Sequence, residues 1–147
     1  MAMLIKFFSS GTGAGKGPTD YCCNIEVPTI ISTLDVTSNR LKSRVLRDEG
    51  GKPIMKTRRP PPQILAGNRE MTRDLIDSLA FKWRYSSGVI AFAPTDRPTD
   101  EQQTNLITEF ESLAFAGIDK ENYNILWIRH NHEDSPELHF IIPRVEL

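Results

Sequence analysis

The stretch from Tyr123 to Val145 constrains the fold of this chain more than any other segment. Its first part, Asn124 to His130, is rich in β-branched and aromatic residues, and its last part, Glu137 to Ile142, alternates polar with apolar residues. The six residues between these parts, 131–136, are all polar or proline. We therefore expect two strands that turn back on each other as an antiparallel hairpin.

The predicted hairpin brings together side chains that can bind a metal ion. Because side chains alternate between the faces of a strand, Glu137 and His139 share one face. If His130 lies on that face too, two imidazoles and a carboxylate converge, a set suited to Mn, Fe, Co, Ni or Zn. His132 and Glu133 are alternative ligands, or hydrogen-bond partners of the ligands. The competing interpretation is a solvated hairpin that carries histidines and binds no metal.

The charge of the chain is distributed unevenly. The 147 residues suit one domain and carry a formal net charge of −1, so no global basic field indicates a nucleic-acid partner. Between Arg40 and Arg59, however, eight basic residues face two acidic ones, a local charge of +6. Such a segment is typical of a mobile surface excursion and of a contact with a nucleic-acid backbone, and these interpretations are compatible.

Cysteine usage and hydropathy bear on the cellular compartment. The only cysteines, Cys22 and Cys23, are adjacent and cannot form a disulfide framework between distant parts of the chain. We therefore expect a reduced, cytoplasmic setting. No apolar run approaches the roughly 20 residues that cross a bilayer, and the N-terminus lacks the apolar core of a signal peptide.

A glycine-rich loop, Gly11 to Gly17, precedes a predicted helix that begins near Pro18. The loop matches neither the P-loop pattern nor the dinucleotide-binding fingerprint. Its small residues allow close approach of the backbone to another group, and Lys16 is a candidate phosphate contact. Tyr21 follows directly and is a candidate functional residue, although a lone tyrosine is more often a half-buried packing residue.

Local patterns predict the other elements. We expect a strand over Met3–Phe8, weak structure or an edge strand within 24–36, and a helix over Arg69–Leu79 capped by Asn68. A strand should follow over Arg84–Pro94, with a bulge or close approach at Gly88, and then a helix that opens with a Thr99–Gln102 capping box and ends at Gly117. Two amphipathic helices and a hairpin favour an α+β fold, an antiparallel sheet with both main helices packed on one face. The other face would carry the His and Glu cluster.

Four blocks of sequence carry a resemblance to a known family. In order they read K-F-F-S-S-G-T-G-A-G-K-G-P-T-D-Y, R-R-P-P-P-Q-I-L-A-G-N-R-E, F-K-W-R-Y-S-S-G-V-I-A-F-A-P and Y-N-I-L-W-I-R-H-N-H-E-D-S-P-E-L-H-F-I-I-P-R-V-E-L. They are similar to the N-terminal relaxase domain of plasmid mobilisation proteins, of the colicin-plasmid type within the HUH endonuclease superfamily. The resemblance covers the chain except about residues 25–57 and implies an HUH-endonuclease-like relaxase domain over 1–147, with a basic insertion at about 37–60.

The resemblance implies a metal-dependent endonuclease and strand transferase that nicks single-stranded DNA at a plasmid transfer origin. The nucleophile falls on Tyr21, which would carry a 5′-phosphotyrosine intermediate. The metal ligands fall on His130, Glu137 and His139, a hybrid of the three-histidine set of most relaxases and the His, Glu, Asn set of the colicin type. The implied cofactor is a divalent metal ion, Mg or Mn first, with Zn, Co or Ni as alternatives.

The implied partners are single-stranded DNA and accessory mobilisation proteins in a bacterial cytoplasm, with no membrane. The predicted DNA-binding residues are basic: Lys16, Lys42, Arg44, Arg47, Lys56, Arg58 and Arg59. Trp83 and Tyr85 could stack on bases but are more typical of core packing. Two alternatives stay open, a rolling-circle replication initiator nuclease and a non-catalytic single-strand DNA-binding accessory module. Mobilisation proteins typically continue beyond the metal ligands, so we expect an isolated domain.

Overall fold

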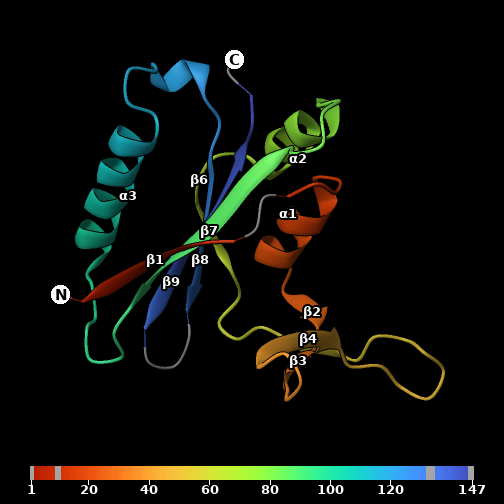
Figure 1. The fold of residues 1–147 in the computed structure, drawn as a ribbon. Coiled ribbons are helices and arrows are strands. Elements are labelled where there is room, and N and C mark those ends of the chain that lie inside the picture. The colour runs from red at the N-terminus through yellow and green to blue at the C-terminus, as the bar shows by residue number, and fades with distance from the viewer. Residues whose placement is uncertain (1, 9–10, 132–134, 146–147) are drawn as a thin grey trace.

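One antiparallel sheet forms the centre of the molecule. The computed structural model describes residues 2–8, 11–131 and 135–145 (Figure 1). The strand order is β1-β7-β9-β8-β6, with β1 Met3–Phe7, β6 Gln63–Ala66, β7 Tyr85–Phe92, β8 Leu126–Asn131 and β9 Pro136–Pro143. The predicted α+β class with an antiparallel sheet is confirmed, and the arrangement is consistent with an HUH-endonuclease-like fold.

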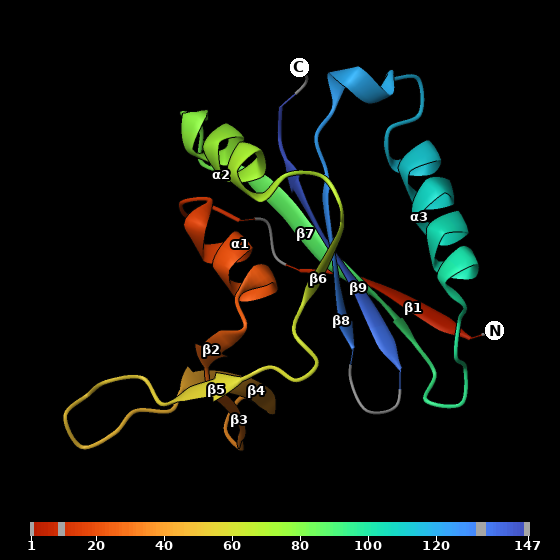
Figure 2. The same ribbon diagram turned by 180° about the vertical axis from the view of Figure 1, so that it is seen from behind.

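The helices cover both faces of this sheet, so the prediction that both main helices share one face is wrong. Helix α3 (Asp100–Ala114) lies on one face, and α1 (Lys16–Cys23) and α2 (Arg69–Ser78) lie on the other (Figures 1 and 2). The physical reason is that β8 and β9 present apolar side chains to both sides. A sheet that is apolar on both faces must be covered on both to remove that area from water.

The face under α3 is an aromatic core. The ring centroid of Phe110 lies 5.3 Å from that of Trp127 and 4.7 Å from that of Phe140. Trp127 and Phe140 are fully buried. The opposite core is aliphatic and unites the two smaller helices with the sheet through Cys22, Ile76, Leu126, Ile128 and Ile141.

Predicted helix starts and a predicted close approach are confirmed. The Asn68 side chain accepts a hydrogen bond from the backbone N–H of Met71 at 2.9 Å, and Thr99 and Gln102 form the capping box. At Gly88 an added Cβ would lie 2.5 Å from both the Lys6 carbonyl oxygen and the Phe140 ring. The third helix ends at Ala114, before Gly117, whose φ is +82°. A short 3₁₀ helix, Lys120–Asn122, leads into β8.

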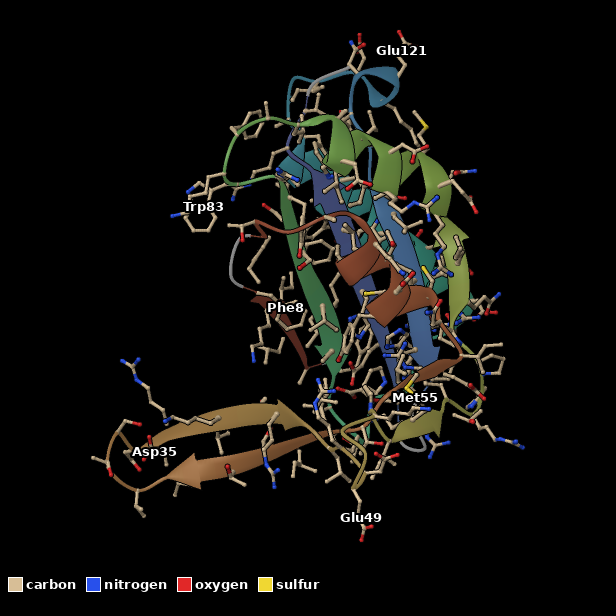
Figure 3. All side chains as sticks on the ribbon, turned by 90° about the vertical axis from the view of Figure 1, so that its right-hand side faces the viewer. Phe8, Asp35, Glu49, Met55, Trp83 and Glu121 are labelled. Carbon is tan, nitrogen blue, oxygen red and sulfur yellow. The ribbon has the colours of Figure 1, made fainter. Side chains whose placement is uncertain are left out.

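Residues 26–57 form an arm that projects away from the sheet, with Asp35 near its tip (Figures 1 and 3). Two antiparallel pairs build it: β2 (Glu26–Pro28) with β5 (Met55–Thr57), and β3 (Ile30–Asp35) with β4 (Arg40–Val45). The prediction of weak structure or an edge strand within 24–36 is therefore wrong, because β2 and β3 pair with β5 and β4 instead of extending the main sheet. Within the described ranges, no helix is long and apolar enough to cross a membrane.

Candidate active site

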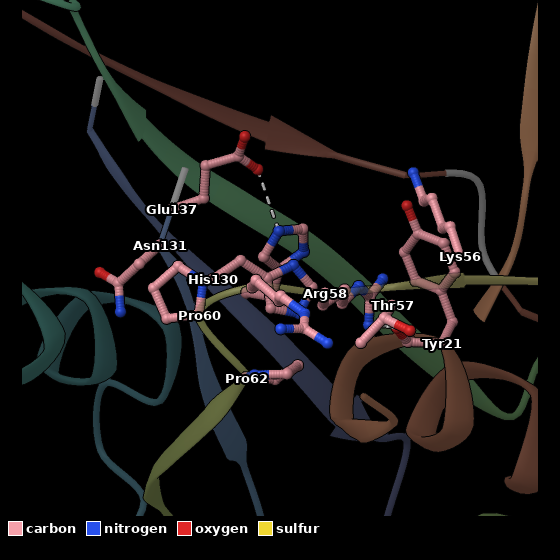
Figure 4. A pocket seen from close by; sticks show the side chains of 11 residues that line it. Tyr21, Lys56, Thr57, Arg58, Pro60, Pro62, His130, Asn131 and Glu137 are labelled. Atoms are coloured by element: carbon pink, nitrogen blue, oxygen red, sulfur yellow. Dashed lines mark hydrogen bonds and ion pairs between the residues drawn. The ribbon is translucent and has the colours of Figure 1, made fainter. Parts of the chain in front are cut away.

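A pocket of about 390 Å³ lies where helix α1, the end of the arm and the β8–β9 hairpin meet (Figure 4). Its walls include Tyr21 from α1, Arg58 and Arg59 from the segment after β5, and His130, Glu137 and His139 from the hairpin. Groups from the two ends of the sequence therefore share one cavity. In Figure 4 the Arg58 side chain stands between His130 and Tyr21.

The hairpin register places the three predicted metal ligands side by side. His130 lies directly across from Glu137, and His139 lies across from Ile128. The imidazole centroids of His130 and His139 are 4.1 Å apart. His139 Nε2 is 3.0 Å from Glu137 Oε2. The alternative ligands His132 and Glu133 lie outside the described residues.

His130 is a buried, neutral imidazole that ties the hairpin to helix α1. Its Nε2–H donates to the carbonyl of Cys22 at 2.7 Å, and its side chain is buried. Burial, the neighbouring His139 and the charge of Arg58 lower the pKa of His130 to about 4, although the contacts with Cys22 and Glu137 act in the opposite direction. Because Cys22 follows Tyr21, this hydrogen bond also fixes the end of α1 against the cluster.

The donor set fits a divalent metal ion in its chemistry. Metal ions bind neutral imidazole, and burial keeps His130 neutral. His139 Nδ1 is buried and has no hydrogen-bond partner among the described residues, so its lone pair could serve a metal ion. As the side chains stand, no three His, Cys, Asp or Glu groups within the described ranges form a ready metal-binding set. For Glu137 to bind the ion together with the two imidazoles, its pair with His139 would have to rearrange.

Tyr21 lies in the last turn of α1 and is 47% exposed. The guanidinium carbon of Arg58 lies 5.1 Å from the centre of its ring. Arg58 Nη1 donates to the backbone carbonyl of Tyr21 and, at 3.2 Å, to that of Asn24. The ring that would carry the nucleophilic hydroxyl is therefore accessible and held by a cation.

The same helix is also anchored by Arg69, the first residue of α2. Arg69 Nη2 lies 2.6 Å from Asp20 Oδ1 and 2.7 Å from Asn24 Oδ1. Sequence reasoning missed Arg69, Cys22 and the role of Arg58 toward α1. These contacts join residues tens of positions apart, and no periodicity or motif in the sequence reports them.

The two other tyrosines of the chain have packing roles. The Tyr85 ring occupies the space that a Cβ on Gly11 would need, and burial raises the pKa of its hydroxyl. Tyr123 stacks on Phe115 with ring centroids 3.8 Å apart and donates to Glu111 at 2.9 Å. Burial and the Glu111 carboxylate raise the pKa of Tyr123 as well. Tyr21 is thus the tyrosine that lines the histidine pocket.

The predicted DNA-binding residues separate into three groups. Lys56, Arg58 and Arg59 line the pocket, whereas Lys42, Arg44 and Arg47 lie earlier in the chain, on β4 of the arm and just after it. Lys16 is the exposed first residue of α1 and is not among the residues that line the pocket.

The glycine-rich loop before α1 approaches protein closely. The N–H of Gly15 donates to the Asp77 carboxylate at 2.7 Å, and a Cβ on Gly15 would lie 2.6 Å from the Arg73 carbonyl oxygen. A carboxylate already occupies the N–H that a phosphate would use, so the close approach of this loop serves the packing of α1 on α2.

Two curated proteins match the chain over nearly its full length. Over 145 residues, 99% of the chain, it is 32% identical to "Cryptic plasmid protein C" of Neisseria gonorrhoeae and 32% identical to "DNA relaxase MbeA" of Escherichia coli. The chain spans 56% of the length of the first protein and 22% of the second. No protein-family model matches the chain, and no solved structure matches it significantly.

Proposed function

We propose, from the confirmed resemblance of this chain to the relaxase domains of plasmid mobilisation proteins, that it nicks and rejoins single-stranded DNA at a plasmid transfer origin. The observation that carries this proposal is the shared pocket of Tyr21 and the His130, Glu137 and His139 cluster. A phenol that is accessible beside two imidazoles, a carboxylate and several cations suits attack on a phosphodiester.

The reaction is a transesterification on Tyr21. Its Oη attacks the phosphorus, the new O–P bond forms, and the bond from phosphorus to the 3′ oxygen breaks. The 5′ end stays on the protein as a phosphotyrosine, the phenolic proton passes to water, and the 3′ oxygen takes up a proton. Reversal rejoins the strand without ATP, because the phosphotyrosine retains the bond energy.

The pocket residues would bind and orient the groups that react. His130, Glu137 and His139 would hold a divalent ion, Mg or Mn first, which when bound supplies positive charge to the scissile phosphate. The Cys22 carbonyl fixes the orientation of the His130 ring. Lys56 and Arg59 would bind neighbouring phosphates at the pocket wall.

The basic arm would hold the DNA strand outside the pocket. Lys42 and Arg44 are exposed on β4, and Lys42 pairs with Asp35 at 2.9 Å in a solvated ion pair that a phosphate could replace at little cost. Because such contacts release counterions, binding should weaken steeply as the salt concentration rises.

The deciding experiment tests Tyr21 as the nucleophile. A single-stranded oligonucleotide from the transfer origin of the encoding plasmid is incubated with protein and Mn²⁺ or Mg²⁺, and the covalent adduct is located by mass spectrometry. Tyr21→Phe should abolish both cleavage and adduct, whereas Tyr123→Phe, which removes a hydroxyl bonded to Glu111, should retain both. Full activity of Tyr21→Phe would exclude Tyr21 as nucleophile.

The same assay separates the alternatives. A chelator should stop cleavage, and added Mn²⁺ or Mg²⁺ should restore it. If no divalent ion changes cleavage or thermal stability, a non-catalytic DNA-binding module is favoured. Cleavage of replication-origin DNA in preference to transfer-origin DNA would instead indicate a rolling-circle initiator.

A further inference from the structure

Arg58 lies where the arm joins the body of the protein, next to the end of helix α1. It follows β5, and its backbone N–H donates to the Ile25 carbonyl at 2.7 Å. Ile25 lies between α1 and β2. The backbone of Arg58 is therefore fixed next to the end of the helix that carries Tyr21, at the point where the arm joins the body.

The side chain of Arg58 completes the end of that helix. The last carbonyls of an α-helix lack partners within the helix, and a cation near them is favourable. The last turn of α1 contains no basic residue of its own. Arg58 Nη1 supplies both the charge and the hydrogen bonds, to the carbonyls of Tyr21 and Asn24.

Its guanidinium also lies against the reacting side chain. With its carbon 5.1 Å from the ring centroid of Tyr21, the guanidinium is within cation–π range of the ring. The planar group can contact the ring and reach two carbonyls at once, which a lysine ammonium on a flexible chain cannot match. Arg58 thus contacts both the backbone and the ring of one residue.

We propose that Arg58 is the positioning residue of the nucleophile: it holds the Tyr21 ring in the pocket so that the hydroxyl faces the phosphate. This inference rests on the proposed strand-transfer function and adds a role beyond phosphate binding. It also gives the arm a part in the reaction, because the segment that leaves the arm delivers Arg58 to α1.

Arg59 provides a matched control. It is the next residue, it carries the same charge and it lines the same pocket, but within the described ranges no hydrogen bond joins it to α1. Loss of Arg59 should therefore remove a phosphate contact without releasing Tyr21. The comparison separates positioning from general electrostatic attraction.

The kinetic test compares Arg58→Ala, Arg58→Lys and Arg59→Ala in the full 147-residue chain. Single-turnover cleavage of the transfer-origin oligonucleotide gives the rate constant at saturating DNA, and a titration gives Kd. Arg58→Ala should lower the rate constant about 10²-fold, the loss typical of a misplaced reacting group, while its Kd changes no more than that of Arg59→Ala. Arg58→Lys should restore the rate only in part. A normal saturated rate with a weakened Kd for Arg58→Ala would overturn the proposal.

A second measurement needs no DNA. With ring-¹³C tyrosine the protein gives signals from Tyr21, Tyr85 and Tyr123, and the first is assigned by its loss in Tyr21→Phe. Arg58→Ala should move the Tyr21 signal and leave the Tyr123 signal in place, which also reports that the variant is folded. An unmoved Tyr21 signal overturns the positioning role. Failure of the wild type to cleave any origin DNA would refute the proposed function, while the NMR result would still decide whether Arg58 holds the ring.

Discussion

The two faces of the sheet are built from the same strands, but one forms a buried core and the other lines the pocket. On the α3 side, Trp127 and Phe140 are fully buried against Phe110. On the other side α1 and α2 cover only part of the sheet, and beyond them His130 and His139 face the pocket. The comparison shows how one hairpin can both stabilise the fold and carry a site, because alternate residues of β8 and β9 point to opposite faces.

This arrangement places the site on a strand whose neighbouring side chains are fully buried. His139 stands between Leu138 and Phe140, whose side chains are fully buried in the aromatic core. A reacting group mounted on such a strand is held with little freedom, which favours accurate geometry. Four predictions test this contrast between the faces.

The largest effect on stability is expected on the aromatic face. Phe140→Ala removes a ring that contacts Phe110 and Trp127 and should lower the free energy of unfolding by about 3–5 kcal/mol. Urea denaturation followed by Trp fluorescence measures the change. On the pocket side, Glu137→Gln should cost about 1 kcal/mol or less, because the side chain is part-exposed and keeps its shape. Equal losses of unfolding free energy for the two variants would refute the view that the aromatic face carries more of the stability than the pocket face.

Thiol chemistry tests how closely α1 is packed. Burial raises the pKa of Cys22 to about 12, and Cys23, less buried, also has a raised pKa. At pH 8 the reactive thiolate of Cys22 should be about 10³-fold rarer than that of an ordinary exposed cysteine, since each pKa unit is tenfold. Mass spectrometry after iodoacetamide treatment should therefore find Cys23 alkylated before Cys22, with both rates rising as the pH rises. Equal rates would show that α1 leaves the sheet readily.

The packing of α1 on α2 depends on Gly15. A methyl group there meets the Arg73 backbone, so Gly15→Ala should lower the free energy of unfolding by about 1–3 kcal/mol and slow cleavage by displacing Tyr21. Gly17 lies in the same helix with nothing within 4 Å of an added Cβ. Gly17→Ala should instead stabilise the protein by about 0.5–1 kcal/mol. Thermal unfolding of the two variants, with the oligonucleotide assay, distinguishes steric contact from a general effect of replacing glycine.

The smallest effect on cleavage is expected from a change in a helix cap remote from the pocket. Thr99→Ala removes the side-chain acceptor for the Gln102 N–H and should cost about 1 kcal/mol of unfolding free energy. Because α3 lies on the aromatic face, the saturated cleavage rate should not change. A slowed reaction in a folded Thr99→Ala protein would mean that the two faces are coupled more strongly than the structure indicates.

Local sequence patterns predicted most helices and strands, but they could not predict contacts between residues far apart in the sequence. The Asn68 cap and the Thr99–Gln102 box depend on neighbours three residues apart, so the sequence displays them directly. The alternation at Glu137 and His139 likewise placed these side chains on one face. The same alternation wrongly suggested an uncovered face, because it holds only at the start of β9 and the rest of the strand is buried on both sides.

The strand pairing in the arm and the contacts that hold Tyr21 could not be predicted from the sequence. Pro28 ends β2 where the sequence suggested an interrupted edge strand, and only the pairing with β5 shows two short strands there. The interactions of Tyr21 with Arg58, and of Asp20 with Arg69, join residues 37 and 49 positions apart. The sequence pattern itself indicated Tyr21 and the hairpin cluster as candidates, and the family resemblance added their roles as nucleophile and metal ligands. The pocket they share appears only in three dimensions.

The strand order has a consequence for how the protein is made. β9, the last strand in this sequence, lies between β7 and β8 and hydrogen-bonds to both. Without β9, the pairs β1–β7 and β6–β8 have no strand to join them. A chain therefore gains its complete sheet and two of its three candidate ligands when β9 is added, and without β9 it has no assembled pocket.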